Sequence, residues 1–173
     1  MKKIVLVAIA LTLTSQLFVQ DAITRFFGKY ETDENFSHVS ITSRMFGLFT
    51  DLEVENEEDQ AVLDAISKLE GLKILAKENT DRGKALYQEI LNKLPKNEYD
   101  ELMSVRDKDK DMKFMIKEKD GKISELLMVM GGDKEFFVLS LFGDIDLKQI
   151  AKISSAMDID GLEGLEKLDG KKN

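Results

Sequence analysis

The hydrophobic positions between residues 100 and 143 fall into four strand-length runs separated by short polar connections. The connections include Asp-Gly and Gly-Gly pairs, which favour the tight turns of β-hairpins. They are too short for the crossovers that parallel strands require. The pattern therefore predicts an antiparallel β-meander, whose strands are Leu102–Arg106, Met112–Glu118, Ile123–Met130 and Glu135–Phe142.

The four runs differ in how far hydrophobic and polar residues alternate. In Met112–Glu118, Phe114 and Ile116 alternate with lysines, with Met115 as the one exception. Alternation is typical of a strand with one face in water, and a strand that is apolar throughout is covered on both faces. We therefore expect Met112–Glu118 to be half exposed and the last two runs to be interior strands.

The first hundred residues combine helical stripes with two further strands. Thr80 is expected to cap a helix that Pro95 ends, Gly71 to stop the helix before it, and Ser43 to cap a short helical turn. The expected helices lie at Asp21–Tyr30, Gln60–Leu69, after Thr80 and after Asp146, and the expected strands at Phe36–Thr42 and Leu72–Lys77.

This order of elements predicts an α+β fold. One mainly antiparallel sheet of five or six strands, with the β-meander in the C-terminal half, packs against several helices. The adjacent Phe26 and Phe27 are expected to pack on the sheet, the alternative being a contact with a membrane surface or a partner.

The first fifteen residues have the layout of a secretory signal peptide. A positive start at Met1-Lys2-Lys3 precedes an apolar core, Ile4–Leu13, and a more polar exit, Thr14-Ser15-Gln16. The apolar core is shorter than the roughly 20 residues of a transmembrane helix. The alternative is a buried N-terminal helix. We expect a leader over residues 1–15, with cleavage between 15 and 20, one domain over 21–168 and a frayed tail over 169–173.

Composition and charge narrow the class of protein. The chain is 43% apolar and 34% charged, as in a globular domain, and its net charge is −8. Nucleic acid and anionic membranes require a cationic surface, so neither is an expected partner. No cysteine is present for disulfides or for a lipid anchor. We expect an exported protein, periplasmic or extracellular, that is soluble and, without its leader, not an integral membrane protein.

Arrangements of catalytic residues are poorly supported. His38 is the one histidine, and no Gly-x-Ser-x-Gly motif occurs. Ser37 adjoins His38, but neighbours on a strand point to opposite faces and form no nucleophile–base pair. Gly131-Gly132 lacks the spacing of a phosphate-binding loop. We therefore expect no enzyme activity, no catalytic residue and no cofactor.

A metal site has one set of weak candidates. Asp107, Asp109, Asp111 and Glu118 match the first, third, fifth and twelfth positions of an EF-hand loop. The sixth position should be glycine, yet it is Met112, and lysines separate the aspartates. Strands rather than helices flank the segment. A charged hairpin connection is the favoured interpretation, and no metal is expected.

Three parts of the chain resemble a known family by their order and spacing. It is domain-of-unknown-function family 4252, small exported proteins of Bacteroidetes-type bacteria, and the resemblance covers about residues 21–168. It implies a signal peptide, an α+β domain and genes near extracytoplasmic-function sigma and anti-sigma factors, and it supplies no catalytic residue. The parts are Phe26-Phe27-Gly-Lys-Tyr30 with Val39-Ser-Ile41 and Met45-Phe46; Tyr99-Asp-Glu-Leu-Met103; and Ile123-Ser-Glu-Leu126 with Gly143-Asp-Ile-Asp-Leu147.

Three functions are considered in order of preference, and the first is the favoured interpretation, with the second as its alternative. The first is a binding or signalling accessory of the cell envelope, which contacts an envelope protein through an exposed sheet edge or through Asp51–Asp59, where six of nine residues are acidic. The second is a carrier of a small molecule or peptide, with an apolar pocket between sheet and helices. The third is an enzyme that uses carboxylates alone.

Overall fold

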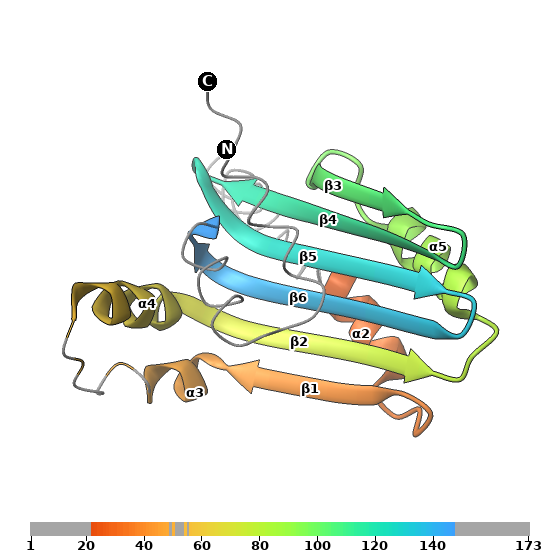
Figure 1. Cartoon of the computed structure of the whole chain (residues 1–173), viewed down its shortest axis with the longest axis horizontal. Coiled ribbons are helices and arrows are strands. Elements are labelled where there is room, and N and C mark those ends of the chain that lie inside the picture. The colour runs from red at the N-terminus through yellow and green to blue at the C-terminus, as the bar shows by residue number, and fades with distance from the viewer. Residues whose placement is uncertain (1–21, 49, 51–53, 55, 148–173) are drawn as a thin grey trace, which may run out of the picture.

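A computed structural model of the chain describes residues 22–48, 50, 54 and 56–147 (Figure 1). In this part of the chain, six antiparallel strands form one sheet in the order β1-β2-β6-β5-β4-β3. The predicted α+β class and the single antiparallel sheet are confirmed. The strands are β1 (Ser37–Thr42), β2 (Leu69–Glu78), β3 (Asp100–Arg106), β4 (Lys110–Lys119), β5 (Lys122–Gly132) and β6 (Glu135–Ile145).

The meander occupies the C-terminal half, as expected. Strands β3 to β6 are consecutive neighbours, and β6 pairs on its other side with β2. The turn between β4 and β5 is Asp120-Gly121, where both residues have positive φ, 55° and 76°. Two positive φ values are typical of the type I′ turn that suits a two-residue hairpin. The two strands predicted from runs that are apolar at nearly every position, β5 and β6, lie inside the sheet as predicted.

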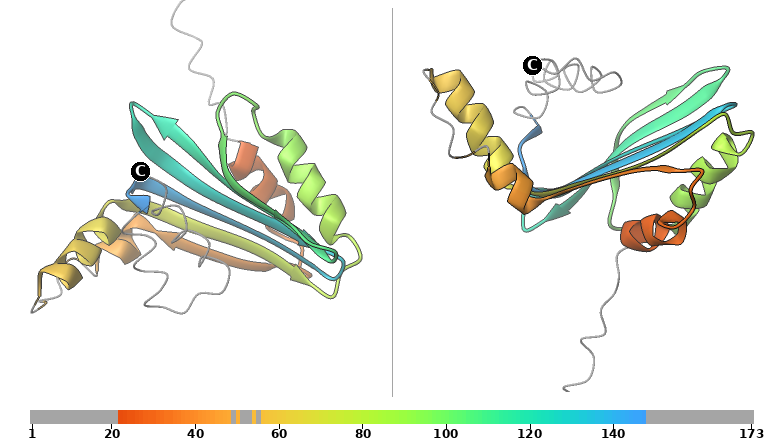
Figure 2. Two further views of the ribbon diagram at one scale, coloured as in Figure 1. Left: turned by 45° about the horizontal axis from the view of Figure 1, so that its top comes forward. Right: turned by 90° about the horizontal axis from the view of Figure 1, so that it is seen from below.

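The helices occupy two places around the sheet. Two of them, α2 (Ala22–Tyr30) and α5 (Gly83–Lys93), cover the same face (Figure 2). The other two, α3 (Ser43–Gly47) and α4 (Glu57–Ser67), lie where β1 ends and β2 begins (Figure 1). None of the described helices has the length and apolar character needed to cross a membrane.

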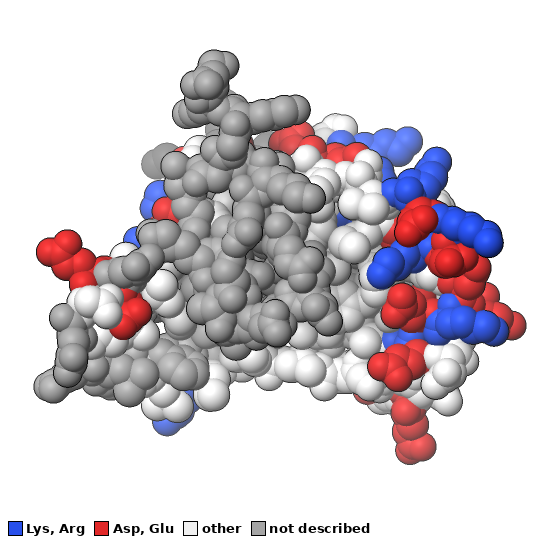
Figure 3. Space-filling model, in the orientation of Figure 1, with Lys and Arg blue, Asp and Glu red and all other residues white. Residues whose placement is uncertain are grey.

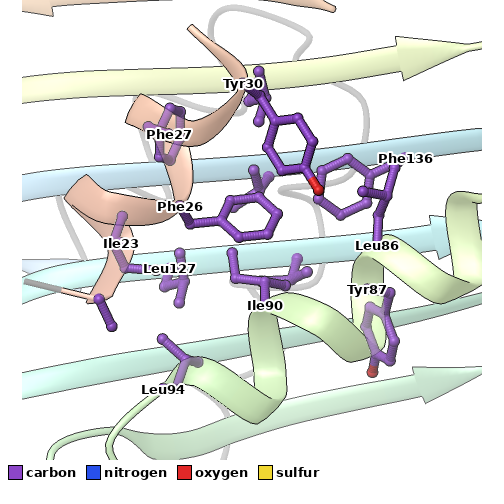
Figure 4. Close-up of a cluster of buried hydrophobic side chains, with 14 of the residues drawn as sticks. Ile23, Phe26, Phe27, Tyr30, Leu86, Tyr87, Ile90, Leu94, Leu127 and Phe136 are labelled. Carbon is purple, nitrogen blue, oxygen red and sulfur yellow. The ribbon is translucent and has the colours of Figure 1, made fainter.

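The face under α2 and α5 holds one hydrophobic core (Figure 4). Both phenylalanines of α2, Phe26 and Phe27, are buried in it, which confirms that they pack on the sheet. Fully burying one such side chain stabilises the fold by about 1.5–3 kcal/mol. The core includes Ile23 and Tyr30 from α2, Leu86, Tyr87 and Ile90 from α5, and Leu75, Met115, Leu127, Val129, Phe136 and Val138 from the sheet.

The opposite face of the sheet holds a second core, and this corrects one prediction. Phe114 and Ile116 of β4 point into it, and Met115 between them points into the first core. All three are buried, so the expectation that this strand is half exposed is wrong. The lysines Lys113 and Lys117 flank this buried triplet, which lies between two cores.

Several helix boundaries in the structure differ from the predicted ones. Helix α4 begins at Glu57, before the predicted Gln60, because Asn56 caps it by accepting the amide of Asp59 at 2.8 Å. Gly71 does not end this helix. It lies inside β2, where a Cβ would be 2.3 Å from the ring of Phe142.

The caps predicted at Ser43 and Thr80 are not formed. Helix α3 begins at Ser43 itself, with Thr42 in the cap position. Helix α5 begins at Gly83, and the hydroxyl of Thr80 accepts the amide of Arg82 in the turn before it. Short polar side chains bind nearby backbone in turns as readily as at caps, so the sequence signal is the same.

The pair Gly131-Gly132 belongs to β5 rather than to the predicted connection, which is formed by Asp133-Lys134. A Cβ on Gly131 would lie 2.4 Å from the Cβ of Tyr87. A Cβ on Gly83 would lie 2.1 Å from the carbonyl oxygen of Glu135. These glycines therefore let α5 touch the β5–β6 hairpin.

Other predictions lie outside the described residues. They are the leader over residues 1–15, residues 51–53 and 55 of the acidic segment, and everything from residue 148 onwards, including the helix expected after Asp146 and the tail over 169–173.

Candidate functional site

A hollow of about 520 Å³ lies between α2 and the edge strand β1. This volume is within the range of small-ligand and side-chain pockets. The polar residues on its walls are Thr24 and Arg25 from α2, Glu31 after it, His38 and Ser40 from β1, and Lys73 from β2, and Phe27 supplies apolar surface. We refer to it as the α2–β1 hollow.

The local fold directs these side chains to the same place. Helix α2 buries Ile23 and Phe26, which leaves Thr24 and Arg25 exposed along its side. In the sheet, His38 is opposite the buried Leu75, and Ser40 is opposite Lys73. Side chains directly opposite one another share a face. His38 and Ser40 therefore face the helical side of the sheet, next to α2.

The α2–β1 hollow has a cationic lining within an acidic protein. Arg25 and Lys73 form no ion pair within the part of the chain that the structure describes. Lys73 Nζ lies 6.0 Å from the ring centre of Phe142. Among the described residues that line the hollow, Glu31 is the single acid. An anionic group is therefore the ligand that the lining favours.

A second hollow of about 280 Å³ continues from the first along the same face, with Thr24 and Lys73 common to both. A row of polar residues crosses the strands at its floor. Lys73 is opposite Ser140, and Glu125 is opposite Lys117. Ser140 Oγ donates a hydrogen bond to Glu125 at 2.6 Å, and Tyr99 Oη donates another at 2.7 Å.

The Glu125 network was missed at the sequence level. Its one signal is an acidic residue inside the apolar run Ile123–Met130. A carboxylate is buried at acceptable cost where hydrogen bonds satisfy it, and the two hydroxyls do so here. The network connects β5 with β6 and with Tyr99 before β3, and it fixes the floor of the second hollow.

Helix α2, one wall of the α2–β1 hollow, is held on α5 through Glu89. Lys29 and Tyr30 of α2 donate to this carboxylate at 2.5 and 3.0 Å, and Lys93 of α5 donates at 3.0 Å. Partial burial raises the pKa of Glu89, but the hydrogen bonds from Lys29, Lys93 and Tyr30 together outweigh it and lower the pKa from 4.5 to about 2. The wall is therefore fixed by a charged cluster.

The two edge strands differ in their protection against pairing. Strand β3 carries Asp100, Glu101 and Arg106, and its register with β4 shifts between Glu101 and Met103. Strand β1 has no Lys, Arg, Asp, Glu or Pro, and its register with β2 is unbroken. Charges, prolines and bulges are the usual means of protecting an edge. Among the described residues, β2 is the one strand that pairs with β1, and the other edge of β1 is open to a further strand.

The distribution of charged side chains on the surface agrees with the difference between the two edge strands. Figure 3 shows charged side chains gathered at the end of the sheet where the β3–β4 and β5–β6 hairpins turn. Uncharged side chains cover the border of the sheet along β1. Val39 of β1 is 44% exposed on this border.

The candidate metal ligands are not brought together. Asp107, Asp109 and Asp111 lie at the β3–β4 hairpin, whereas Glu118 is near the other end of β4, about 20–25 Å away at the rise of a strand. Asp111 Oδ1 accepts from Arg106 Nε at 3.1 Å. Among the described residues, no three His, Cys, Asp or Glu side chains are grouped to hold a metal.

The predicted separation of Ser37 and His38 agrees with the strand register, in which they are opposite Ala76 and Leu75. His38 lines the α2–β1 hollow and is exposed, with its ring 6.5 Å from that of Phe36. The interior between the sheet and its helices, where an apolar carrier pocket was an open expectation, is occupied by the first core. Most of the residues that line the two hollows are polar, but apolar atoms make up the larger share of the lining surface.

Comparison with known proteins adds a family match. A family model described as domain of unknown function (DUF4252) matches residues 30–153. The match begins at the end of α2 and includes all of the described strands. Neither a search of curated proteins nor a search of solved structures finds a match.

Proposed function

Since the chain belongs to the DUF4252 family, whose description names no activity, we propose from the structure that it is a binding accessory of the cell envelope, which pairs an extended partner segment with β1. The proposed role is non-catalytic. The observation that carries it is a contrast between the two edges of the described sheet: the free edge of β1 is unprotected, whereas β3, at the opposite edge, is protected.

Strand addition suits this edge for physical reasons. The backbone groups on the free side of an edge strand are ready to hydrogen-bond with another chain, and many binding domains use an edge in this way. Strand β1 offers six residues for pairing, and β2 holds it in unbroken register. The α2–β1 hollow beside it gives room for side chains of the added strand.

The proposed location in the cell envelope rests on features of the sequence. The leader-like residues 1–15 support export, and the net charge of −8 supports a protein partner rather than nucleic acid or an anionic membrane surface. The interior between the sheet and its helices is packed, which favours protein binding over the carrier of an apolar molecule.

A site-specific photo-crosslinker in the native host tests the proposal. It replaces Val39 on β1 or, as the control, Val105 on β3, since these valines are 44% and 43% exposed. We expect one dominant adduct from position 39 and none of that size from position 105. The crosslinked stretch of the partner, made as a peptide, should then protect backbone amides of β1 from hydrogen exchange. Equal adducts from both positions, or a peptide that leaves β1 unprotected, would overturn the proposal.

A further inference from the structure

We infer that the α2–β1 hollow receives an acidic side chain of the segment that pairs with β1, with Arg25 and Lys73 as its cationic partners. The inference rests on the proposed pairing at β1 and adds the chemistry by which a partner is selected. Backbone pairing is the same for every sequence, so selectivity has to come from pockets for alternate side chains.

The register of the sheet places such a side chain in the hollow. Leu75 and Lys73 of β2 share the helical face with His38 and Ser40 of β1. A strand added beyond β1 continues this pattern, because directly opposite residues share a face and the side chains along a strand alternate. Every second residue of the added strand therefore faces the helical side, where the hollow is open beside β1.

The lining of the hollow suits a carboxylate with an aliphatic stem. Arg25 presents a planar guanidinium, which binds carboxylates with two parallel hydrogen bonds, and Lys73 adds a second positive charge. Thr24 and Ser40 supply hydroxyl donors, and Phe27 supplies apolar surface for methylene groups.

The cations of the hollow are available, unlike others on the same face. Lys113 and Lys117 of β4 pair with Glu101 and Glu98. Lys73 and Arg25 have no such partner within the described residues, and the one acid on the described lining is Glu31. A glutamate from the partner would supply the missing negative charge.

Two blocked hexapeptides test the inference. The first is acetyl-Thr-Val-Glu-Val-Thr-Val-amide, and the second has Gln in place of Glu, which keeps the shape and removes the charge. Binding to the isotope-labelled full chain is followed by amide chemical shifts. We expect the Glu peptide to bind about tenfold more tightly, the range of a charge-assisted hydrogen bond. The difference should fall below about twofold in Lys73→Gln and Arg25→Gln and persist in Lys96→Gln, an exposed control.

A third peptide separates this inference from the proposed function. It is the Glu peptide with methylated backbone nitrogens, which cannot pair with a strand edge. If the Glu and Gln peptides bind equally and the methylated peptide does not, strand pairing stands and the acidic selectivity is overturned. If the methylated peptide still binds through Lys73, the hollow binds carboxylates and pairing at β1 is overturned. If no peptide shifts the β1 amides, both are overturned.

Discussion

Ser140 in β6 donates its hydroxyl hydrogen to the carboxylate of Glu125 in β5 across 2.6 Å, although the two residues are diagonal in the strand register. They are 2% and 5% exposed. A carboxylate so deeply buried is tolerated only where donors satisfy it, and Tyr99 provides the second one. The hydrogen bond therefore stabilises both the register of the central strands and the floor of the second hollow.

Removing the hydroxyl of Ser140 should destabilise the protein. We expect Ser140→Ala to lower the free energy of unfolding by about 1–3 kcal/mol, because the buried carboxylate of Glu125 loses one hydrogen bond. Ser37→Ala is the matched control on an exposed strand position, where the change should stay within about 0.5 kcal/mol. Urea unfolding measures both. Equal stabilities of the two variants would show that the Ser140 hydrogen bond contributes nothing.

Two glycine substitutions should have opposite effects. In Gly131→Ala the new Cβ would meet Tyr87 at 2.4 Å and the carbonyl oxygen of Gly83 at 2.6 Å, so we expect a loss of about 1–3 kcal/mol from overpacking. In Gly28→Ala the new Cβ has no atom within 4 Å, and alanine inside a helix is more stable than glycine by about 0.5–1 kcal/mol. Urea midpoints should therefore shift in opposite directions. A shift in the same direction would contradict the close contact of α5 with β5.

The same glycines show where prediction from sequence stops. The length and apolar character of β5 and β6 were sufficient to predict two interior strands. A glycine that lets a helix approach a strand, such as Gly131, is indistinguishable in sequence from a glycine that forms a turn. The predicted connection, residues 131–134, therefore included Gly131-Gly132, whereas the observed one is Asp133-Lys134 alone.

The candidate site was less predictable than the fold. An exposed sheet edge was among the open expectations. The sequence shows that β1 is uncharged and that β3 carries charges, but it does not show that these two strands form the edges of the sheet. Arg25, His38 and Lys73 are far apart in the chain, and they meet only because β1 pairs with β2 while α2 packs over the same face. Long-range pairing of this kind leaves no local pattern.

The charged cluster at Glu89 should make the free energy of unfolding depend on pH in the acidic range. The folded pKa of Glu89 is about 2, below its ordinary value of 4.5, so its contribution is complete above about pH 4.5 and is lost as the pH falls toward 2. After allowance for solvent screening, we expect about 1–2 kcal/mol from this group. The unfolding free energy of Glu89→Gln should therefore fall less steeply across this window than that of the wild type.

The control for this pH dependence is Gln88→Ala, an exposed neutral position on the same helix. It should keep the wild-type slope between about pH 4.5 and 2. Urea unfolding at several pH values gives the slopes. Identical slopes for the wild type and Glu89→Gln would show that the contacts with Lys29, Tyr30 and Lys93 do not hold α2 on α5.

Calcium should leave the stability unchanged. Glu118 lies far along β4 from the aspartates of the β3–β4 hairpin, and Asp111 is engaged by Arg106, so the four carboxylates cannot surround one ion in this fold. We expect the same Tm with millimolar calcium and with a chelator, for the wild type and for Asp109→Asn. A rise in Tm that Asp109→Asn abolishes would instead support a calcium site at the hairpin.

A lysine on the free edge of β1 should block strand addition. Lysines on edge strands oppose pairing in natural sheets, because pairing would crowd or desolvate the charge. We expect Val39→Lys to weaken binding of acetyl-Thr-Val-Gln-Val-Thr-Val-amide about tenfold, as measured by amide chemical shifts. This peptide is neutral, so the new charge cannot attract it.

The control for this prediction is on the other edge strand. Val105→Lys places the same charge at an equally exposed valine of β3 and should leave binding unchanged. Because both side chains are exposed, neither variant should lose more than about 0.5 kcal/mol of stability. Weaker binding in Val105→Lys alone would move the docking edge from β1 to β3.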